Sequence, residues 1–167
     1  PEEEPQEKHE NDSVPIVETI KTKPKQIIYV LGVSYGYNTI AYIGFTYFLS
    51  YLTGIGYGET ESLISQLFYS AVLILSAPFF GLLSDRIGRR PVMVIGGIAM
   101  AIFLFMYFPI VGTGSIVLVA LAFAITGLLT GITQGPIPSF AGEQFPARLR
   151  YSGMSAFYQI GAALGGG

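Results

Sequence analysis

The sequence predicts an all-α membrane protein, and three observations support this fold class. Only 12% of the residues are charged, against about 25% in typical soluble domains, and a soluble chain of this length has too small a core to bury its apolar stretches. Charged residues are confined to short segments, and most stretches between them are long enough for the roughly 20 residues of a membrane-spanning helix. Runs such as 92–108 are apolar on all sides and lack the alternation typical of membrane barrel strands.

Five membrane-spanning helices are expected. Glycine-containing turns at 53–58 and 112–115, and two arginine-containing connections, separate them. Pro91 suits the first turn of the third helix, where a missing N–H costs nothing, and Pro136 and Pro138 are expected to kink the fourth. The predicted spans are about 27–51, 62–83, 91–110, 115–142 and 152–167, of which the last is truncated.

Residues 1–26 form a separate segment rich in Glu, Lys, Pro and Gln. Such a composition buries too little apolar surface to offset the entropy of ordering, so we expect a mobile cytoplasmic segment there. Because the chain begins at Pro1 and ends inside an apolar run shorter than a span, we expect an internal fragment of a longer membrane protein. The net charge of -2 gives no indication of a nucleic-acid partner.

The basic residues predict the orientation of the helices in the membrane. They precede the first span or lie in every second connection, and the remaining connections have none. Loops rich in Lys and Arg face the cytoplasm, so we expect a multi-pass protein of the cell membrane whose N-terminal segment and basic loops are cytoplasmic. The nine basic residues are Lys8, Lys21, Lys23, Lys25, Arg86, Arg89, Arg90, Arg148 and Arg150.

Glycines recur at four-residue spacing within the predicted helices. Membrane helices lack the usual hydrophobic drive for association, and small residues allow close backbone contact between them. We therefore predict tight helix packing at these positions. The glycines are Gly32 and Gly36, then Gly127, Gly131 and Gly135, and finally Gly161 and Gly165.

The connection at 81–91 is the most specific local pattern in the chain. Asp85 lies at the end of a predicted helix, where a carboxylate has the wrong sign for the helix dipole, so it is expected to have a partner, either an arginine or the N-terminus of another helix. Gly81 permits a neighbouring backbone to approach, and Gly88 permits a tight turn. Lipid phosphates and the acids of other inner loops, Glu143 above all, are the expected partners of the arginines, Arg86, Arg89 and Arg90.

This segment, Gly-Leu-Leu-Ser-Asp-Arg-Ile-Gly-Arg-Arg, resembles the signature of the major facilitator superfamily. The following inner loop, 135–153, has Gly-Pro-x-Pro and Glu-x-Phe-Pro-x-Arg-x-Arg elements similar to those of sugar porters and, more closely, metabolite:proton symporters. The resemblance implies a helical bundle of twelve helices, of which this chain is the C-terminal half from about helix 7 to helix 11. The missing N-terminal six-helix half is then a partner of this chain.

The resemblance also implies a function. We expect a secondary active transporter that works by alternating access, by proton-coupled symport of an organic acid, a betaine-like compound or a sugar. The inner loops are expected to close the cytoplasmic side through an ion-pair network, and membrane lipids are expected neighbours. The expected gate residues are Gly81, Asp85, Arg86, Gly88, Arg89, Arg90, Glu143, Arg148 and Arg150.

Polar residues within the spans are the candidates for substrate contact, because no ionisable acid or base lies inside them. Transporter sites lie near the bilayer midplane, and each candidate also has a simpler role as a hydrogen-bond partner of a neighbouring helix. Symporter relatives often carry a glutamate where this chain has Tyr37, and a basic residue where it has Ser34. This departure leaves the organic-acid substrate and the proton-coupling site open. The candidates are Tyr35, Asn38, Tyr42, Gln134 and Gln159.

Two other classes are weighed against transport. A membrane-embedded enzyme generally needs an intramembrane cluster of His, Asp, Glu or Cys, and the spans contain none. A non-transporting structural membrane protein is the other alternative, since helix packing explains many of the small residues. No metal or cofactor site is expected, because cysteine is absent and the one histidine, His9, lies in the polar segment.

Overall fold

The computed structural model describes residues 24–145 and 147–166, and the regular elements in these ranges are all helical. The all-α prediction is therefore confirmed. The expected N-terminal segment lies almost entirely outside the described residues, although helix already begins at Pro24. The elements are α2 (Pro24–Tyr42), the π-helical η1 (Ile43–Tyr47), α3 (Phe48–Gly54), α4 (Glu59–Ile87), α5 (Arg89–Val111), α6 (Ile116–Gln134), α7 (Ile137–Glu143) and α8 (Ala147–Gly166).

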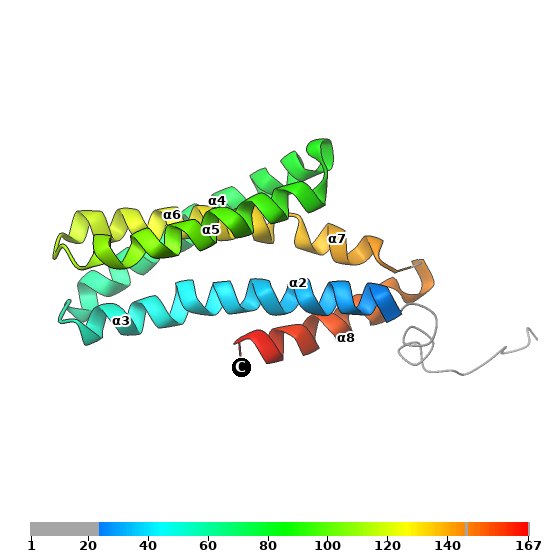
Figure 1. The fold of residues 1–167 in the computed structure, drawn as a ribbon, viewed down its shortest axis with the longest axis horizontal. Helices are drawn as coiled ribbons and strands as arrows, with labels where there is room; N and C mark the ends of the chain where they lie inside the picture. The colour runs from blue at the N-terminus through cyan, green and yellow to red at the C-terminus, as the bar shows by residue number, and fades with distance from the viewer. Residues whose placement is uncertain (1–23, 146, 167) are drawn as a thin grey trace, which may run out of the picture.

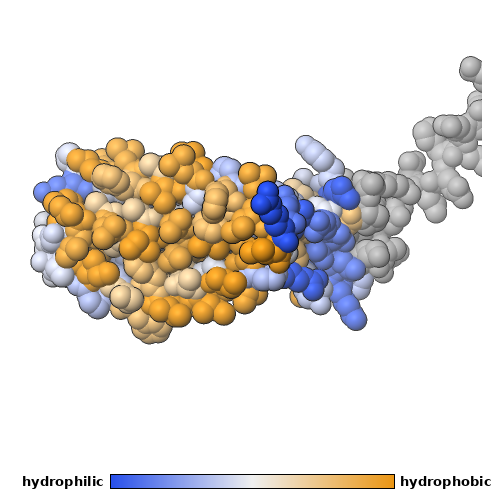
Figure 2. Space-filling model, turned by 90° about the horizontal axis from the view of Figure 1, so that it is seen from above, coloured by the Kyte–Doolittle hydropathy of each residue, from blue (hydrophilic) through white to orange (hydrophobic). Residues whose placement is uncertain are grey.

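Three helical stretches in the described part of the chain are long and apolar enough to cross a membrane. They are α4, α5, and the stretch formed by α6 with α7, and they match the second, third and fourth predicted spans. The first and fifth predicted spans coincide with α2–η1–α3 and α8, which are helical but are not among these three. On the face seen in Figure 2, hydrophobic residues cover most of the middle, with the largest group of hydrophilic residues at one end and a smaller group at the other.

The helices pack as two pairs, α4 along α6 and α2 along α8, and α5 lies against α6 (Figure 1). Glycines allow the two helices of each pair to approach closely. A Cβ on Gly127 would strike the Tyr69 carbonyl of α4, and a Cβ on Gly161 would strike Ser34 of α2. The predicted role of the glycines is thus confirmed for α6 and α8. It is not seen for Gly32 and Gly36, since no atom of the described residues lies within 4 Å of a Cβ added there and α2 contacts α8 through its opposite face.

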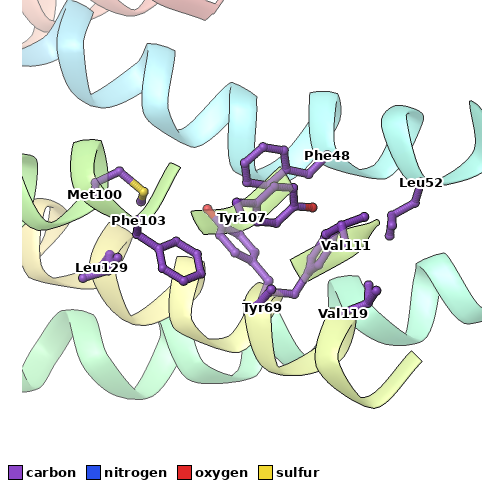
Figure 3. Close-up of a cluster of buried hydrophobic side chains, with 11 residues drawn as sticks. Phe48, Leu52, Tyr69, Met100, Phe103, Tyr107, Val111, Val119 and Leu129 are labelled. Atoms are coloured by element: carbon purple, nitrogen blue, oxygen red, sulfur yellow. The ribbon is translucent and has the colours of Figure 1, made fainter. Parts of the chain in front are cut away.

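An aromatic cluster joins α3, α5 and α6 near the turns 55–58 and 112–115. The rings of Phe48 and Tyr107 stack with centroids 3.6 Å apart and an interplanar angle of 9°, and Phe123 meets both of them (Figure 3). Since lipid is as apolar as these rings, close contact and dispersion stabilise the cluster more than removal from water does.

Two irregularities interrupt the long helices. α6 ends at Gln134 and α7 begins at Ile137, so the chain breaks at Pro136, where a kink was predicted. The π-helical turn η1 was not predicted. It contains Gly44, whose Cβ position lies 3.2 Å from both the Tyr69 ring and Thr126, so the side chains of α4 and α6 approach the backbone of this turn closely. Such π-helical turns often occur at functional sites.

The orientation of the bundle can be tested by labelling. The sequence contains no cysteine, so a single cysteine introduced at Thr113 or Arg86, both exposed and in opposite connections, reports one side only. If basic loops are cytoplasmic, an impermeant thiol reagent added to intact cells should label Thr113→Cys and leave Arg86→Cys unlabelled until the membrane is opened. Labelling of both positions from the same side would contradict the predicted topology.

Candidate functional site

A single glycine connects α4 to α5 at the end of the molecule that carries the arginines. α4 ends at Ile87 and α5 begins at Arg89, and Gly88 between them has φ of 99°, a conformation that other residues rarely adopt. The turn places Arg89 next to Asp85, with Arg89 Nη2 3.0 Å from Asp85 Oδ1. The expected partner of this carboxylate at the helix end is therefore an arginine four residues further along the chain.

Arg89 also reaches the end of α7. Its Nη1 lies 2.5 Å from Glu143 Oε1, and its side chain is only 21% exposed, against 52% for Asp85 and 58% for Glu143. One guanidinium thus bridges two carboxylates and links the α4–α5 turn to α7. Exposed ion pairs contribute about 0–1 kcal/mol each, which suits a contact that forms and breaks during a transport cycle.

Arg86, Arg90 and Arg150 form no ion pair among the residues whose side chains the structure describes. Arg86 is exposed, and Arg90 is exposed beside the hollow around the ion pairs. The aliphatic part of Arg150 passes Gly142, with its Cδ 3.6 Å from an added Cβ. The side chain of Arg148 lies outside the described residues. Between the adjacent Arg89 and Arg90, the structure places Arg89 in the ion pairs.

The glycine of the signature loop brings two helix ends together. A Cβ on Gly81 would lie 3.3 Å from the carbonyl oxygen of Gly135, the residue that follows α6, and the buried Ser84 hydroxyl donates a hydrogen bond of 2.6 Å to the Gly81 carbonyl. A hollow of about 460 Å³ adjoins the ion pairs, and Ser84, Gly88 and Glu143 are among its lining residues. α4, α5, α6 and α7 therefore meet at this end of the bundle through small residues and one shared guanidinium.

A second polar region lies midway along the bundle, where α2 crosses α8. The Ser34 hydroxyl donates a hydrogen bond of 2.6 Å to the Tyr158 carbonyl. The Asn38 side-chain amide donates to the Ser34 carbonyl at 2.8 Å and also reaches the Ser34 hydroxyl at 3.4 Å. Both Asn38 bonds lie within α2, so the hydrogen bond that links α2 to α8 here comes from Ser34 and not from Asn38.

The structure places the other predicted substrate-contact residues at different positions along the bundle. Tyr35 and Tyr42 are half exposed, and they pack over the end of α8, where a Cβ on Gly165 would strike the Tyr35 carbonyl and one on Gly166 the Tyr42 ring. Gln159 is exposed on α8 beside Tyr158, and Gln134 is the last residue of α6 before the kink. The structure therefore brings Asn38 close to the α8 segment that contains Gln159, and places Gln134 nearer the inner end.

Several residues at mid-depth were not among the predicted contacts. Tyr69 of α4 is buried against Gly44, and Tyr37 of α2 and Tyr158 of α8 are partly exposed. A tyrosine near the middle of several predicted spans was visible in the sequence. How far each ring is buried depends on how α2, α4 and α8 are rotated about their axes, which the sequence pattern left open.

Comparison with known proteins supplies further evidence. The family model described as Major Facilitator Superfamily matches residues 1–167. The glycine betaine/proline/ectoine/pipecolic acid transporter OusA of Dickeya dadantii (strain 3937) is 27% identical over 143 residues, which cover 85% of this chain and 28% of that protein.

Two further relatives come from Escherichia coli (strain K12). The inner membrane metabolite transport protein YhjE is 35% identical over 134 residues, which cover 76% of this chain and 30% of that protein. The proline/betaine transporter is 25% identical over 143 residues, or 85% of this chain and 29% of that protein. The chain thus spans less than a third of the length of these relatives. No solved structure matches it significantly.

Proposed function

Because the chain belongs to the Major Facilitator Superfamily, we propose that it forms part of a secondary active transporter of a small polar solute, working by alternating access in the cell membrane. Its apolar helices make it part of a multi-pass membrane protein. Family membership separates it from membrane-embedded enzymes. Since the chain covers less than a third of its relatives, the proposal concerns the complete polypeptide, including a half that this sequence does not contain.

Among the substrate classes considered, the proposed one is a compact zwitterion of the betaine or proline kind. The names of the relatives include glycine betaine, proline and ectoine. The four described acids, Glu59, Glu61, Asp85 and Glu143, all lie at helix ends, and the described basic residues lie there too. A net anion would favour an opposing charge at mid-depth, whereas a zwitterion is neutral overall and avoids that cost.

The ion pairs of Arg89 are proposed to hold the cytoplasmic side closed. The observation behind this proposal is that one guanidinium joins the α4–α5 turn to the end of α7. Opening this side would separate those elements and expose the hollow beside them. Proton coupling is proposed as well, with the proton-carrying carboxylate in the half that precedes these helices, because the described spans contain none.

Uptake by the complete polypeptide in proteoliposomes tests the proposed function. Glycine betaine and proline should accumulate inside when an inward proton gradient is imposed, and a protonophore should abolish the accumulation. A sugar and an organic acid supplied at the same concentration should not accumulate. Accumulation of the organic acid or the sugar alone would overturn the substrate class, and failure to accumulate any of the four compounds would count against transport of this kind.

A further inference from the structure

The side-chain amide of Asn38 is held in one orientation by its own helix. Its Nδ2 donates a hydrogen bond of 2.8 Å to the Ser34 carbonyl and lies 3.4 Å from the Ser34 hydroxyl oxygen. A carbonyl oxygen can only accept a hydrogen bond, so the nitrogen of the amide must face the helix backbone. The side-chain oxygen, Oδ1, therefore points away from the turn that precedes Asn38.

This oxygen is an acceptor to which no group donates among the residues that the structure describes. Asn38 is partly exposed, and its oxygen is not among the buried atoms that lack a partner. Gln66 of α4 is the contrasting amide, because both of its polar atoms also lack a partner but are buried, with 7% of the residue exposed. Asn38 thus offers an acceptor that an incoming group can reach.

The residue that anchors Asn38 is itself fixed at the contact between α2 and α8. The buried Ser34 hydroxyl donates a hydrogen bond of 2.6 Å to the Tyr158 carbonyl, and α8 approaches so closely that a Cβ on Gly161 would strike Ser34. Asn38 lies midway along the stretch 24–54 formed by α2, η1 and α3, and transporter sites lie near the bilayer midplane. The helix contact therefore holds this acceptor at the depth where a solute is bound.

The chemistry of this acceptor suits a donor that carries positive charge. The four described acids lie at helix ends, so no described carboxylate meets an ammonium group at mid-depth. An amide oxygen accepts a hydrogen bond from a charged N–H, and such bonds are stronger than those between neutral groups. A quaternary nitrogen has only carbon substituents and cannot form this bond. The acceptor therefore distinguishes ammonium groups by whether they have an N–H.

We propose that Asn38 Oδ1 accepts a hydrogen bond from the ammonium N–H of the transported zwitterion and so favours proline-like solutes over fully N-methylated ones. The inference rests on the proposed function, and within its substrate class it assigns the choice of solute to one side-chain atom. The amide can turn this oxygen elsewhere only by giving up its bond to the Ser34 carbonyl, so the acceptor is pre-organised for the solute.

Two substitutions separate the outward oxygen from the bond within α2. Asn38→Leu removes both. Asn38→Thr keeps a bond to the Ser34 carbonyl, because threonine hydroxyls in this chain donate to the carbonyl four residues earlier, as those of Thr126 and Thr130 do at 2.8 Å, and this bond draws the hydroxyl oxygen back to the backbone. In the complete polypeptide, both variants should raise the KM for proline about ten-fold, as expected for loss of one hydrogen bond to a charged group, with kcat little changed.

The matched solute is N,N-dimethylproline, which has the ring and the carboxylate of proline but no N–H. Its KM should stay within about two-fold of the wild-type value in both variants, because it forms no hydrogen bond that the substitutions remove. The matched control variant is Thr39→Ala, which removes the neighbouring hydroxyl that donates to the Tyr35 carbonyl at 2.9 Å, also within α2. The KM for either solute should not change in this control.

Isothermal titration into the detergent-solubilised complete protein measures binding apart from transport. Proline should bind about ten-fold more weakly to both variants, and N,N-dimethylproline should bind to them as it does to wild type. If Asn38→Thr binds proline like wild type, Asn38 serves only its own helix and the assignment is wrong. Equal losses for the two solutes, or no binding of proline to wild type, would also overturn it. Wild-type protein that shows the expected binding pattern but accumulates no proline would instead refute the proposed transport and leave the binding assignment intact.

Discussion

Replacement of Arg89 by glutamine is expected to lower solute uptake by the complete transporter about ten-fold. The substitution removes both ion pairs, to Asp85 and to Glu143, and leaves two carboxylates facing each other without a cation between them. Two partly exposed pairs are worth about 0–2 kcal/mol together, and about 1.4 kcal/mol changes an equilibrium ten-fold. The balance should therefore move from the inward-closed towards the inward-open form.

The change of state is measurable apart from uptake. Ser84 is buried beside the ion pairs, so a cysteine introduced there should react about ten-fold faster with a thiol reagent from the cytoplasmic side when Arg89 is replaced. Asp85→Asn removes only one of the two pairs and should have a smaller effect.

The matched control for Arg89 is Arg86→Gln, which removes the same charge from the same connection. Arg86 is exposed and forms no ion pair among the described residues, so uptake and labelling should remain close to wild type. Equal defects in the two variants would indicate that the loop acts through its total positive charge, by orienting the helices, and would remove the support for a gate at Arg89.

Replacement of Gly127 by valine is expected to destabilise the bundle by about 1–3 kcal/mol or to prevent folding. A Cβ at this position would strike the backbone carbonyl of Tyr69, and a backbone atom cannot move aside by changing rotamer. α4 and α6 would have to separate along the most extensive contact in the structure. The measurement is the thermal unfolding of the detergent-solubilised complete protein, followed by size-exclusion chromatography after heating.

Gly36→Val is the control for this prediction. It introduces the same β-branched side chain into a membrane helix, but no atom lies within 4 Å of the added Cβ, so the unfolding temperature should change much less. If the two variants unfold at the same temperature, valine's own effect on the helix would explain the loss and the close packing of α6 on α4 would not be its cause.

The architecture was largely predictable because charge and length are local properties of the sequence. Uncharged stretches of bilayer length, separated by Arg-containing connections, indicated helices, and the structure has helices at all five predicted places. The boundaries differ where polar residues continue a helix. α4 extends to Ile87 past Asp85, and α8 starts at Ala147, because charged side chains at a membrane surface remain in water while the backbone stays helical.

Contacts between helices were less predictable, since they depend on the rotation of each helix about its axis. The same four-residue glycine spacing occurs in α2 and α6, yet Gly127 is packed against Tyr69 while Gly36 faces open space. Likewise, adjacent arginines have equal charge, and only the turn at Gly88 determines that Arg89 reaches both acids.

The sequence by itself determined that this is a helical membrane protein, where its helices lie, and which loop carries the family's signature. These features follow from composition, from the spacing of charges and from the residues of a motif, all of which are local properties of the sequence. Only the tertiary structure decided that Arg89 is the bridging cation and that the Ser34 hydroxyl links α2 to α8. Those relations join residues far apart in the chain, and they arise from the packing of helix faces against each other.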